Sequence, residues 1–456
     1  MSKLKNIPEN CEFPQLREIA EEKQLAEKLQ QHLGPAFASS ELQVESCKID
    51  ELNYKPGGAC RIILTARIRR PNADESDQQV YFGRLLQPRN AQRLPALLDQ
   101  KNLTPPRFGP PVLYIPEWSF ILWAYPNDPR LPGLALMANS ERMLARAQTA
   151  PEKFGLTQPP LALTAEMTKY VSGKRCGYLY HVQPPPHSGA SNGDASSFAV
   201  YGKAYGNGEG EKAYALMKQI WRSQACQRGD FFLPQPYSYD AENEIVWQEA
   251  FSGESFAKIA GTIPNLPEMA QEIGRRLAGF HNASLPLPQV MTFDFQVEET
   301  RRNLRAIEEA FPDYREDCAA LGQKLMNAAA QIGPGPVTPL HASFKFSHIF
   351  AADKGLAFID FDSANLGDPG FDVGRFIAHL YKMKADWKIA PEVADMTVTN
   401  FSAAYNHTAA VPLSQERIDW FAASHLISSQ VYKSVKRMDA SPVNKLWKIA
   451  ESLCPA

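Results

Sequence analysis

Residues 341–376 read HASFKFSHIFAADKGLAFIDFDSANLGDPGFDVGRF. Within this stretch the apolar run LAFI ends directly before Asp360, and GDPGFD follows with Asp368 and Asp372. A short apolar run that is bounded by glycine and aspartate predicts a buried strand. A carboxylate at the end of such a strand is a hard oxygen ligand of the kind that Mg²⁺ prefers. The stretch therefore predicts a loop, a strand and a metal-binding carboxylate in close succession.

Helix signals surround this stretch. Residues 266–281 place Met269, Ile273 and Leu277 at helical spacing, and 297–331 has the pattern of two charged amphipathic helices. Residues 413–452 predict two closing helices with Ser414 and Ser441 as their N-caps. The chain after about residue 262 is thus expected to be mainly helical.

The first half of the chain contains two segments, 41–145 and 160–262, with the same order of signals. Three pairs of landmarks lie at separations of 116, 119 and 124 residues: Tyr54 and Tyr170, Gly83 and Gly202, Trp123 and Trp247. Each copy predicts a glycine-containing hairpin, a third strand, a helix and a pair of later strands. A duplicated β-rich unit explains the order, and a chance recurrence of hairpin signals is the alternative.

Composition sets limits on the class of protein. The 456 residues include 48 basic and 50 acidic side chains, with 44% hydrophobic and 21% charged residues, as in an ordinary globular protein. Neither disorder nor a purely electrostatic nucleic-acid binder is expected. No apolar run is long enough for a membrane helix, so we expect a cytoplasmic protein without membrane contact. The seven cysteines form no CxxC pair, which predicts reduced and mostly buried thiols.

The 341–376 stretch resembles the aminoglycoside phosphotransferase and choline kinase family, a branch of the protein-kinase-like fold. That family carries H-G-D-x-x-x-x-N, then I-D-F or I-D-W, then G-D-P-x-x-D. The corresponding residues here are His341-Ala342-Ser343 with His348, then Ile359-Asp360-Phe361, then Gly367-Asp368-Pro369 with Asp372. The second half of the pattern is complete, whereas the first half departs from it at three positions.

The resemblance extends upstream to about residue 160. Gly173 and Lys174 lie in a hairpin similar to the one that covers the nucleotide phosphates in the family, and Lys203 resembles its nucleotide-binding lysine. Gln248 and Glu249 resemble the hinge segment that contacts adenine. The first repeat then resembles a second N-lobe, in which Arg84 stands where Lys203 stands in the second.

The resemblance implies an α+β, bilobal, protein-kinase-like fold with a duplicated N-lobe. We expect a helical segment at 1–40, an N-lobe-like repeat without its own C-lobe at 41–150, a nucleotide-binding N-lobe at 160–262, and a helical C-lobe at 263–456. The C-lobe would carry the metal site and the catalytic loop.

The implied activity is phosphoryl transfer from ATP, with Mg²⁺, to a hydroxyl or amine of a small molecule. Asp360 would hold the metal, and His348, a softer ligand, suits Mn²⁺ better. Ser343 stands at the catalytic aspartate position, where loss of a carboxylate base costs typically about 10²- to 10⁴-fold in rate. His341 would order the loop, and Asp362 would act as a second ligand or substitute base if the strand continued past Asp360.

The alternative is a pseudokinase that binds nucleotide, or nothing, and acts as a scaffold. Its first lobe would then contact the rest of the chain or a second copy. Residues 262–456 hold 22 acidic and 19 basic residues, so no strong field selects a polycationic acceptor. The acceptor is therefore not specified by the sequence.

Overall fold

A computed structural model describes residue 7 and the ranges 11–34, 42–55, 58, 60–70, 75–87, 94–98, 103–185, 198–251, 254–263, 265–352 and 355–454. Two compact units divide the chain. The first comprises 1–210, 239–245 and 436–440, and the second comprises 211–238, 246–435 and 441–456. The polar segments 69–79 and 184–197, which we expect to be turns between the second and third strands of each repeat, lie partly outside the described residues, at 71–74 and 186–197.

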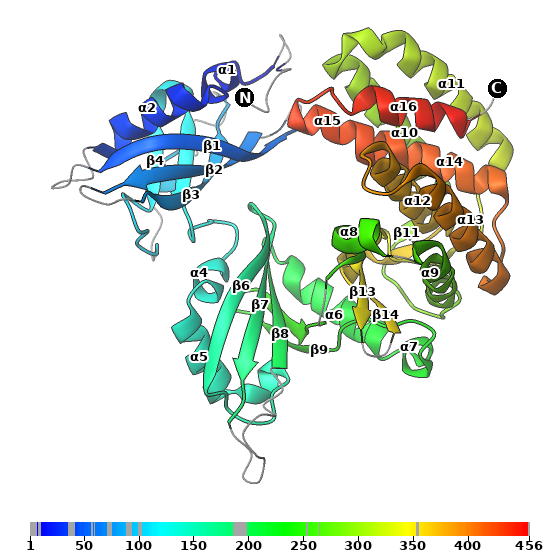
Figure 1. The fold of residues 1–456 in the computed structure, drawn as a ribbon, viewed down its shortest axis with the longest axis horizontal. Coiled ribbons are helices and arrows are strands. Elements are labelled where there is room, and N and C mark those ends of the chain that lie inside the picture. The colour runs from blue at the N-terminus through cyan, green and yellow to red at the C-terminus, as the bar shows by residue number, and fades with distance from the viewer. Residues whose placement is uncertain are drawn as a thin grey trace. The chain divides into compact units, whose positions relative to one another are not determined.

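The first sheet has the strand order β1-β2-β3-β5-β4 and is antiparallel throughout. Its strands are β1 (Gln43–Tyr54), β2 (Cys60–Arg69), β3 (Asp77–Leu85), β4 (Val112–Ile115) and β5 (Phe120–Ala124). Alternate residues of β2 are buried, as period-two patterning requires when one face covers a core. Helices α1 (Leu16–Ile19) and α2 (Glu22–Leu33) pack on that face (Figure 1). The short α3 (Leu94–Leu98) follows β3.

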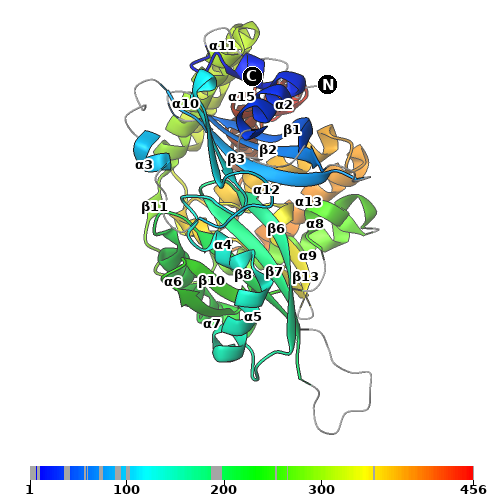
Figure 2. The same ribbon diagram turned by 90° about the vertical axis from the view of Figure 1, so that its left-hand side faces the viewer.

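The second sheet repeats this order as β6-β7-β8-β10-β9. Its strands are β6 (Ala162–Val171), β7 (Arg175–Gln183), β8 (Phe198–Tyr205), β9 (Pro236–Asp240) and β10 (Ile245–Glu249). Helices α4 (Leu134–Met137) and α5 (Ser140–Thr149) precede it, and α5 packs against β6 (Figure 2). Over the described residues the two sheets thus share one topology, which confirms the duplicated β-rich fold.

The second unit is mainly helical and carries small sheets around the 341–376 stretch. Its helices are α6 (Glu209–Trp221), α7 (Gln224–Arg228), α8 (Phe256–Ile259), α9 (Leu266–His281), α10 (Phe293–Ala310), α11 (Arg315–Ile332), α12 (Gly370–Ala385), α13 (Pro391–Thr408), α14 (Gln415–His425), α15 (Tyr432–Arg437) and α16 (Val443–Ser452). Helix α6 belongs to this unit from Glu211 onward, and α15 belongs to it as far as Val435. Its short strands are β11 (Val290–Met291), β12 (Thr338–Leu340), β13 (Ile349–Ala352), β14 (Gly355–Phe358) and β15 (Asn365–Gly367).

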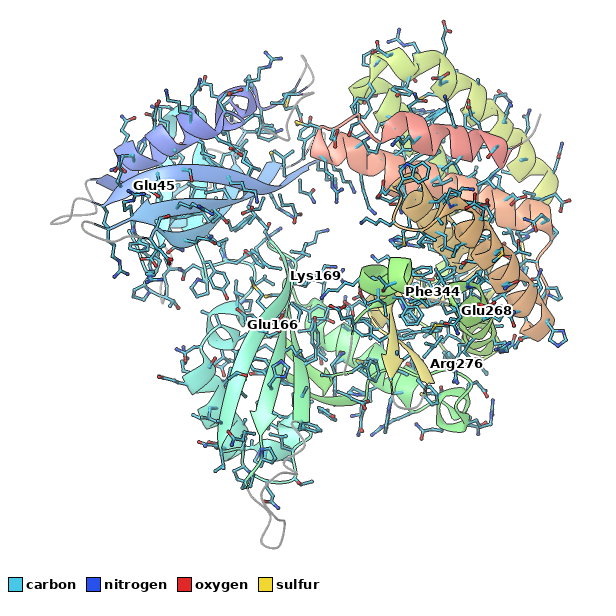
Figure 3. The ribbon with its side chains drawn as sticks, viewed as in Figure 1. Glu45, Glu166, Lys169, Glu268, Arg276 and Phe344 are labelled. Carbon is cyan, nitrogen blue, oxygen red and sulfur yellow. The ribbon has the colours of Figure 1, made fainter. Side chains whose placement is uncertain are left out.

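A cluster of aromatic rings fixes the 341–376 stretch inside this unit. Phe344 is fully buried, with its ring 4.8 Å from that of Phe358 and 5.5 Å from that of Phe376 between centroids. Phe346 stacks on Phe376 at 4.9 Å. Figure 3 labels Phe344 among the side chains of this unit. Burying such rings stabilises a fold by about 1.5–3 kcal/mol each, so the loop is anchored by its apolar residues.

Most of the helix predictions are confirmed. Helix α9 spans Leu266–His281, and the two charged helices are α10 and α11. Ser414 caps α14 by accepting a hydrogen bond from the amide of Arg417, but α16 begins after Pro442, so the N-cap expected at Ser441 is wrong. All seven cysteines are free, and all but Cys11 are buried. Among the described helices, none is both long and apolar enough to cross a membrane.

Helices α9 and α13 approach each other closely at Gly274, where an added Cβ would lie 2.5 Å from the carbonyl oxygen of Phe401. We expect Gly274→Ala to destabilise the protein by about 1–3 kcal/mol because two helix backbones would have to separate. Gly322 of α11 is the matched control, since its nearest neighbour would be 3.4 Å away. Gly322→Ala should be neutral or stabilising by up to about 1 kcal/mol. Urea denaturation of both variants checks the contrast, and equal effects would contradict it.

Candidate functional site

The loop that begins at His341 is held by the carboxylate of Asp372, on α12. Asp372 Oδ2 accepts a hydrogen bond from the His341 amide at 2.6 Å and lies 3.2 Å from Nε2 of His281, whose Nδ1 is 2.7 Å from the Tyr405 hydroxyl. Burial alone would raise the pKa of Asp372, but the hydrogen bond and charge of His281, together with His341, hold that pKa below its usual range. Asp372 therefore acts as the buried anchor of the loop.

Ser343 lies at the centre of a hydrogen-bonded group. His341 Nε2 is 2.9 Å from the carbonyl oxygen of Ile359, which only accepts, so the hydrogen of a neutral His341 is on Nε2. Burial lowers the pKa of His341, against the opposing charges of Asp372 and Asp360, which favours this neutral ring. Its bare Nδ1 lies 3.1 Å from Ser343 Oγ. The serine hydroxyl is also 3.2 Å from the Asp360 carbonyl oxygen, so acceptors surround its one hydrogen.

The side chains of His348 and Asp360 lie next to each other and close to Ser343. His348 Nε2 lies 3.3 Å from Asp360 Oδ2, and His348 Nδ1 lies 3.4 Å from Ser343 Oγ. His348 is buried, whereas Ser343 and Asp360 are partly accessible. The structure thus brings together four of the predicted residues, His341, Ser343, His348 and Asp360, within one unit.

The backbone at Asp360 turns sharply. Strand β14 ends at Phe358, and Asp360 has φ of 70°, in the left-handed region. Asp362 then lies in a 3₁₀ turn, Phe361–Ser363. The prediction that the strand continues to Asp362 is therefore wrong. The inference that Asp362 lies on the same face as Asp360 depended on that strand and is not supported. The left-handed residue redirects the chain before a second strand position is reached.

The Asp368 carboxylate is held by an ion pair and a hydrogen bond within the protein. It pairs with Arg417 of α14, and its Oδ1 accepts from the Gly370 amide at 2.9 Å, closing the Asp-Pro turn that starts α12. Burial raises the pKa of Asp368, and the Arg417 charge opposes that shift. Asp368 and Asp372 therefore both act as structural carboxylates.

Lys203 lies in the first unit, on the third strand of the second sheet. It pairs across the sheet with Gly177 and is half-buried, and its ammonium is 5.1 Å from the centroid of the Tyr205 ring. On the same face a side chain at Gly177 would collide with the Tyr201 hydroxyl. This face of β7 and β8 thus combines the cations Arg175 and Lys203, a glycine and two phenol rings.

The hairpin residues Gly173 and Lys174 join β6 to β7. Gly173 is buried with φ of 64°, a conformation that glycine adopts without strain, and its amide donates to Asp128. Lys174 is exposed. In the second unit, Gln248 and Glu249 end β10, and Glu249 is bound to Gln235 by both its amide and its carboxylate.

A preformed metal cage is absent from the described part of the chain, in which no group of three or more His, Cys, Asp or Glu side chains converges. The Asp360 carboxylate and the adjacent His348 ring offer two donors of different softness. A divalent cation held there would need further oxygen ligands from a bound phosphate or water.

Three residues of these networks are absent from the sequence-based site. His281 ends the predicted helix 266–281, where a histidine on the apolar face is a signal for a buried polar partner. Arg375 of α12 donates to the Ala342 carbonyl oxygen at 3.2 Å. Asp128 follows the first sheet in an Asn-Asp-Pro sequence that reads as an ordinary turn.

The family comparison agrees with this geometry. Residues 209–410 match the model of the family described as "Phosphotransferase enzyme family". The match spans the Asp372-anchored loop and begins after Lys203. The matched segment, 209–410, is thus similar to the phosphotransferases.

Several solved structures are similar to the chain. Aminoglycoside phosphotransferase APH(4)-Ia is 13% identical, with 68% of this chain and 98% of that chain covered and a TM-score of 0.45. A choline/ethanolamine kinase family protein from Mesorhizobium loti is 15% identical (70% and 92% covered, TM-score 0.43), and choline kinase from Cryptosporidium parvum is 8% identical (69% and 95%, 0.43). No curated protein sequence matches the chain.

The family-model match agrees with the resemblance drawn from the sequence. The region matched, 209–410, has the histidine loop, the strand-end Asp360 and the G-D-P-x-x-D pattern of the aminoglycoside phosphotransferase and choline kinase family.

Ala342 occupies the position at which the family has glycine, and its φ is 58°. An L-residue in this region costs roughly 1–2 kcal/mol, part of which the lower unfolded-state entropy of alanine offsets. We expect Ala342→Gly to stabilise the protein by about 1 kcal/mol. Ala364→Gly is the control, because Ala364 has φ of −58° and should lose stability. Thermal denaturation measures both, and a loss of stability in Ala342→Gly would contradict the strain at this residue.

Proposed function

We propose that the protein is an ATP-dependent, divalent-metal-dependent phosphotransferase that acts on a hydroxyl or amine of a small molecule. The observation that carries the proposal is the pairing of a strand-end carboxylate, Asp360, with a histidine loop anchored by Asp372, inside the segment that matches the phosphotransferase family. Phosphoryl transfer depends on positioning and charge neutralisation, which such a loop supplies.

In this proposal the predicted residues divide between nucleotide, metal and acceptor. Lys203, Gly173 and Lys174 contact the phosphates, and the backbone at Gln248 and Glu249 contacts adenine. Asp360, with His348, holds the metal that neutralises phosphate charge. The loop from His341 to His348 faces the acceptor.

Ser343 is the observation that favours a second candidate, a pseudokinase that acts as a nucleotide-binding module or as a scaffold or regulatory module. A serine hydroxyl is not the carboxylate base that the family uses, and here its hydrogen is directed at protein acceptors. Asp362 lies in a 3₁₀ turn, so the strand geometry that suggested it as a substitute base is missing. The two candidates differ in turnover, and only the first requires nucleotide binding.

The metal role of Asp360 is tested by Asp360→Asn. Asparagine tolerates positive φ, so this variant removes charge and leaves the backbone conformation. Wild-type protein should gain about 2.7 kcal/mol of stability at a hundredfold excess of ATP or ADP over Kd, with Mg²⁺ or Mn²⁺ present. The variant should lose the metal-dependent part of that gain in a thermal-shift titration.

Asp395→Asn is the matched control, since Asp395 forms an exposed ion pair with Lys384 away from the loop. It should keep the full shift. An unchanged metal-dependent shift in Asp360→Asn would remove Asp360 from the metal site.

Catalytic competence is tested by Ser343→Asp, which restores a carboxylate beside the two imidazoles. If the first proposal holds, ADP formation should rise, by up to about 10²- to 10⁴-fold, because a general base is supplied. The rate of ADP release at saturating ATP, with nucleotide affinity measured in parallel, checks it. A flat rate with retained nucleotide binding favours the scaffold instead.

A further inference from the structure

A segment that leaves the first sheet contacts the hairpin of the second. Asp128, four residues after β5, is 6% exposed, and its Oδ2 accepts hydrogen bonds from the Gly173 amide at 2.6 Å and the Tyr170 hydroxyl at 2.8 Å. Its Oδ1 accepts from the amide of Arg130 at 3.0 Å. One buried carboxylate thus binds both the strand end and the turn of the β6–β7 hairpin.

The fit around this carboxylate depends on two glycines. A Cβ at Gly173 would lie 3.0 Å from the Arg130 side chain, and a Cβ at Gly206 would collide with the Arg130 carbonyl oxygen. The Gly206 amide also donates to the carbonyl oxygen of Lys174 at 3.0 Å, which ties the hairpin to the end of β8. The segment 128–130 therefore sits against the hairpin and the end of β8 together.

The register of the sheet places this contact on one face. Tyr170 pairs with Cys176 and Cys176 with Ala204, whereas Lys203 pairs with Gly177. Since neighbouring residues of a strand point to opposite faces, Tyr170 and Lys203 lie on opposite faces of the sheet.

Two tyrosines of β7 share the face of Tyr170. Tyr178 is hydrogen-bonded to Tyr125, and Tyr180 donates to the carbonyl oxygen of Met137 at 2.9 Å. Residues 125–137 thus cover the second sheet from the side away from Lys203. In Figure 3, Glu166 and Lys169 mark β6, whose register shifts between Met167 and Lys169 just before Tyr170.

Charge also favours the contact. Burial raises the pKa of Asp128, while the amides of Arg130 and Gly173, the Tyr170 hydroxyl and the Arg61 charge oppose that shift. Arg61 belongs to β2, so the first sheet supplies both the segment and a compensating cation. The hydrogen-bond donors that a buried carboxylate needs are present.

We propose that Asp128 is a positioning residue, which fixes the Gly173 hairpin from the face opposite Lys203 so that the hairpin is ordered before nucleotide binds. The proposal rests on the function proposed above, and it gives the first repeat a role in the second. Binding to a preordered hairpin avoids the entropic cost of ordering it, so loss of Asp128 weakens nucleotide binding.

The experiment compares Asp128→Ala and Asp128→Asn with wild type in two measurements on the full chain. Hydrogen exchange reports the protection of the peptide spanning 170–176, and calorimetry reports Kd for ADP with Mg²⁺. Asp128→Ala should expose the hairpin to exchange and raise Kd about 10-fold or more, because hydrogen bonds to a charged group are lost. The amide oxygen of Asp128→Asn still accepts from Gly173, so its hairpin exchange and its Kd should lie between those of wild type and Asp128→Ala. This variant replaces Asp128→Ala in the test if the alanine variant does not fold.

Leu64→Ala is the control for a general loss of stability, since Leu64 is buried in the core of the first sheet. It should lower Tm and leave hairpin exchange and Kd as in wild type. Unchanged exchange in Asp128→Ala, or faster exchange with unchanged Kd, would overturn the positioning role alone. Wild-type protein that binds no Mg²⁺–ADP would overturn the proposed function, and the positioning role with it.

Discussion

The loop that carries the candidate chemistry depends on one buried carboxylate. Asp372 receives the amide of His341 on one side and faces His281 on the other, and His281 is tied in turn to Tyr405. Three helices, α9, α12 and α13, thereby meet at the start of the loop. A buried charge of this kind is stable only with its partners in place, so the helical packing and the loop conformation require each other.

The polar groups beyond this anchor form a graded series from buried to accessible. His341 and His348 are buried, and Ser343 and Asp360 are partly open. Each imidazole uses Nε2 toward an acceptor oxygen and turns Nδ1 toward the same hydroxyl. The departures from the family pattern are therefore mutually compatible: a serine fits between two histidines, where a carboxylate would need at least one of them protonated.

Much of this architecture could be predicted from the sequence because the signals for it are local. Helical spacing in 266–281 and the order of landmarks in the two repeats specify elements whose residues are neighbours in the chain. The position of Asp360 at the end of a strand could be predicted from an apolar run and a motif. The left-handed conformation of Asp360 could not be predicted, because φ is set by the surrounding contacts. The sequence-based prediction for Asp362 was wrong for that reason. Asp128 was missed because its partners, Tyr170 and Gly173, are more than 40 residues away and no local pattern connects them.

The contact between residues 128–130 and the hairpin also bears on how the duplicated chain evolves. Once the exit segment of the first copy supports the turn of the second, neither copy can be lost without the other losing a partner. A larger residue at Gly173 or Gly206 is tolerated only with a change near Arg130, and Tyr170 is tied to the acid at 128. A substitution at one of these positions therefore changes the packing of the others, so the two sheets constrain each other's sequence.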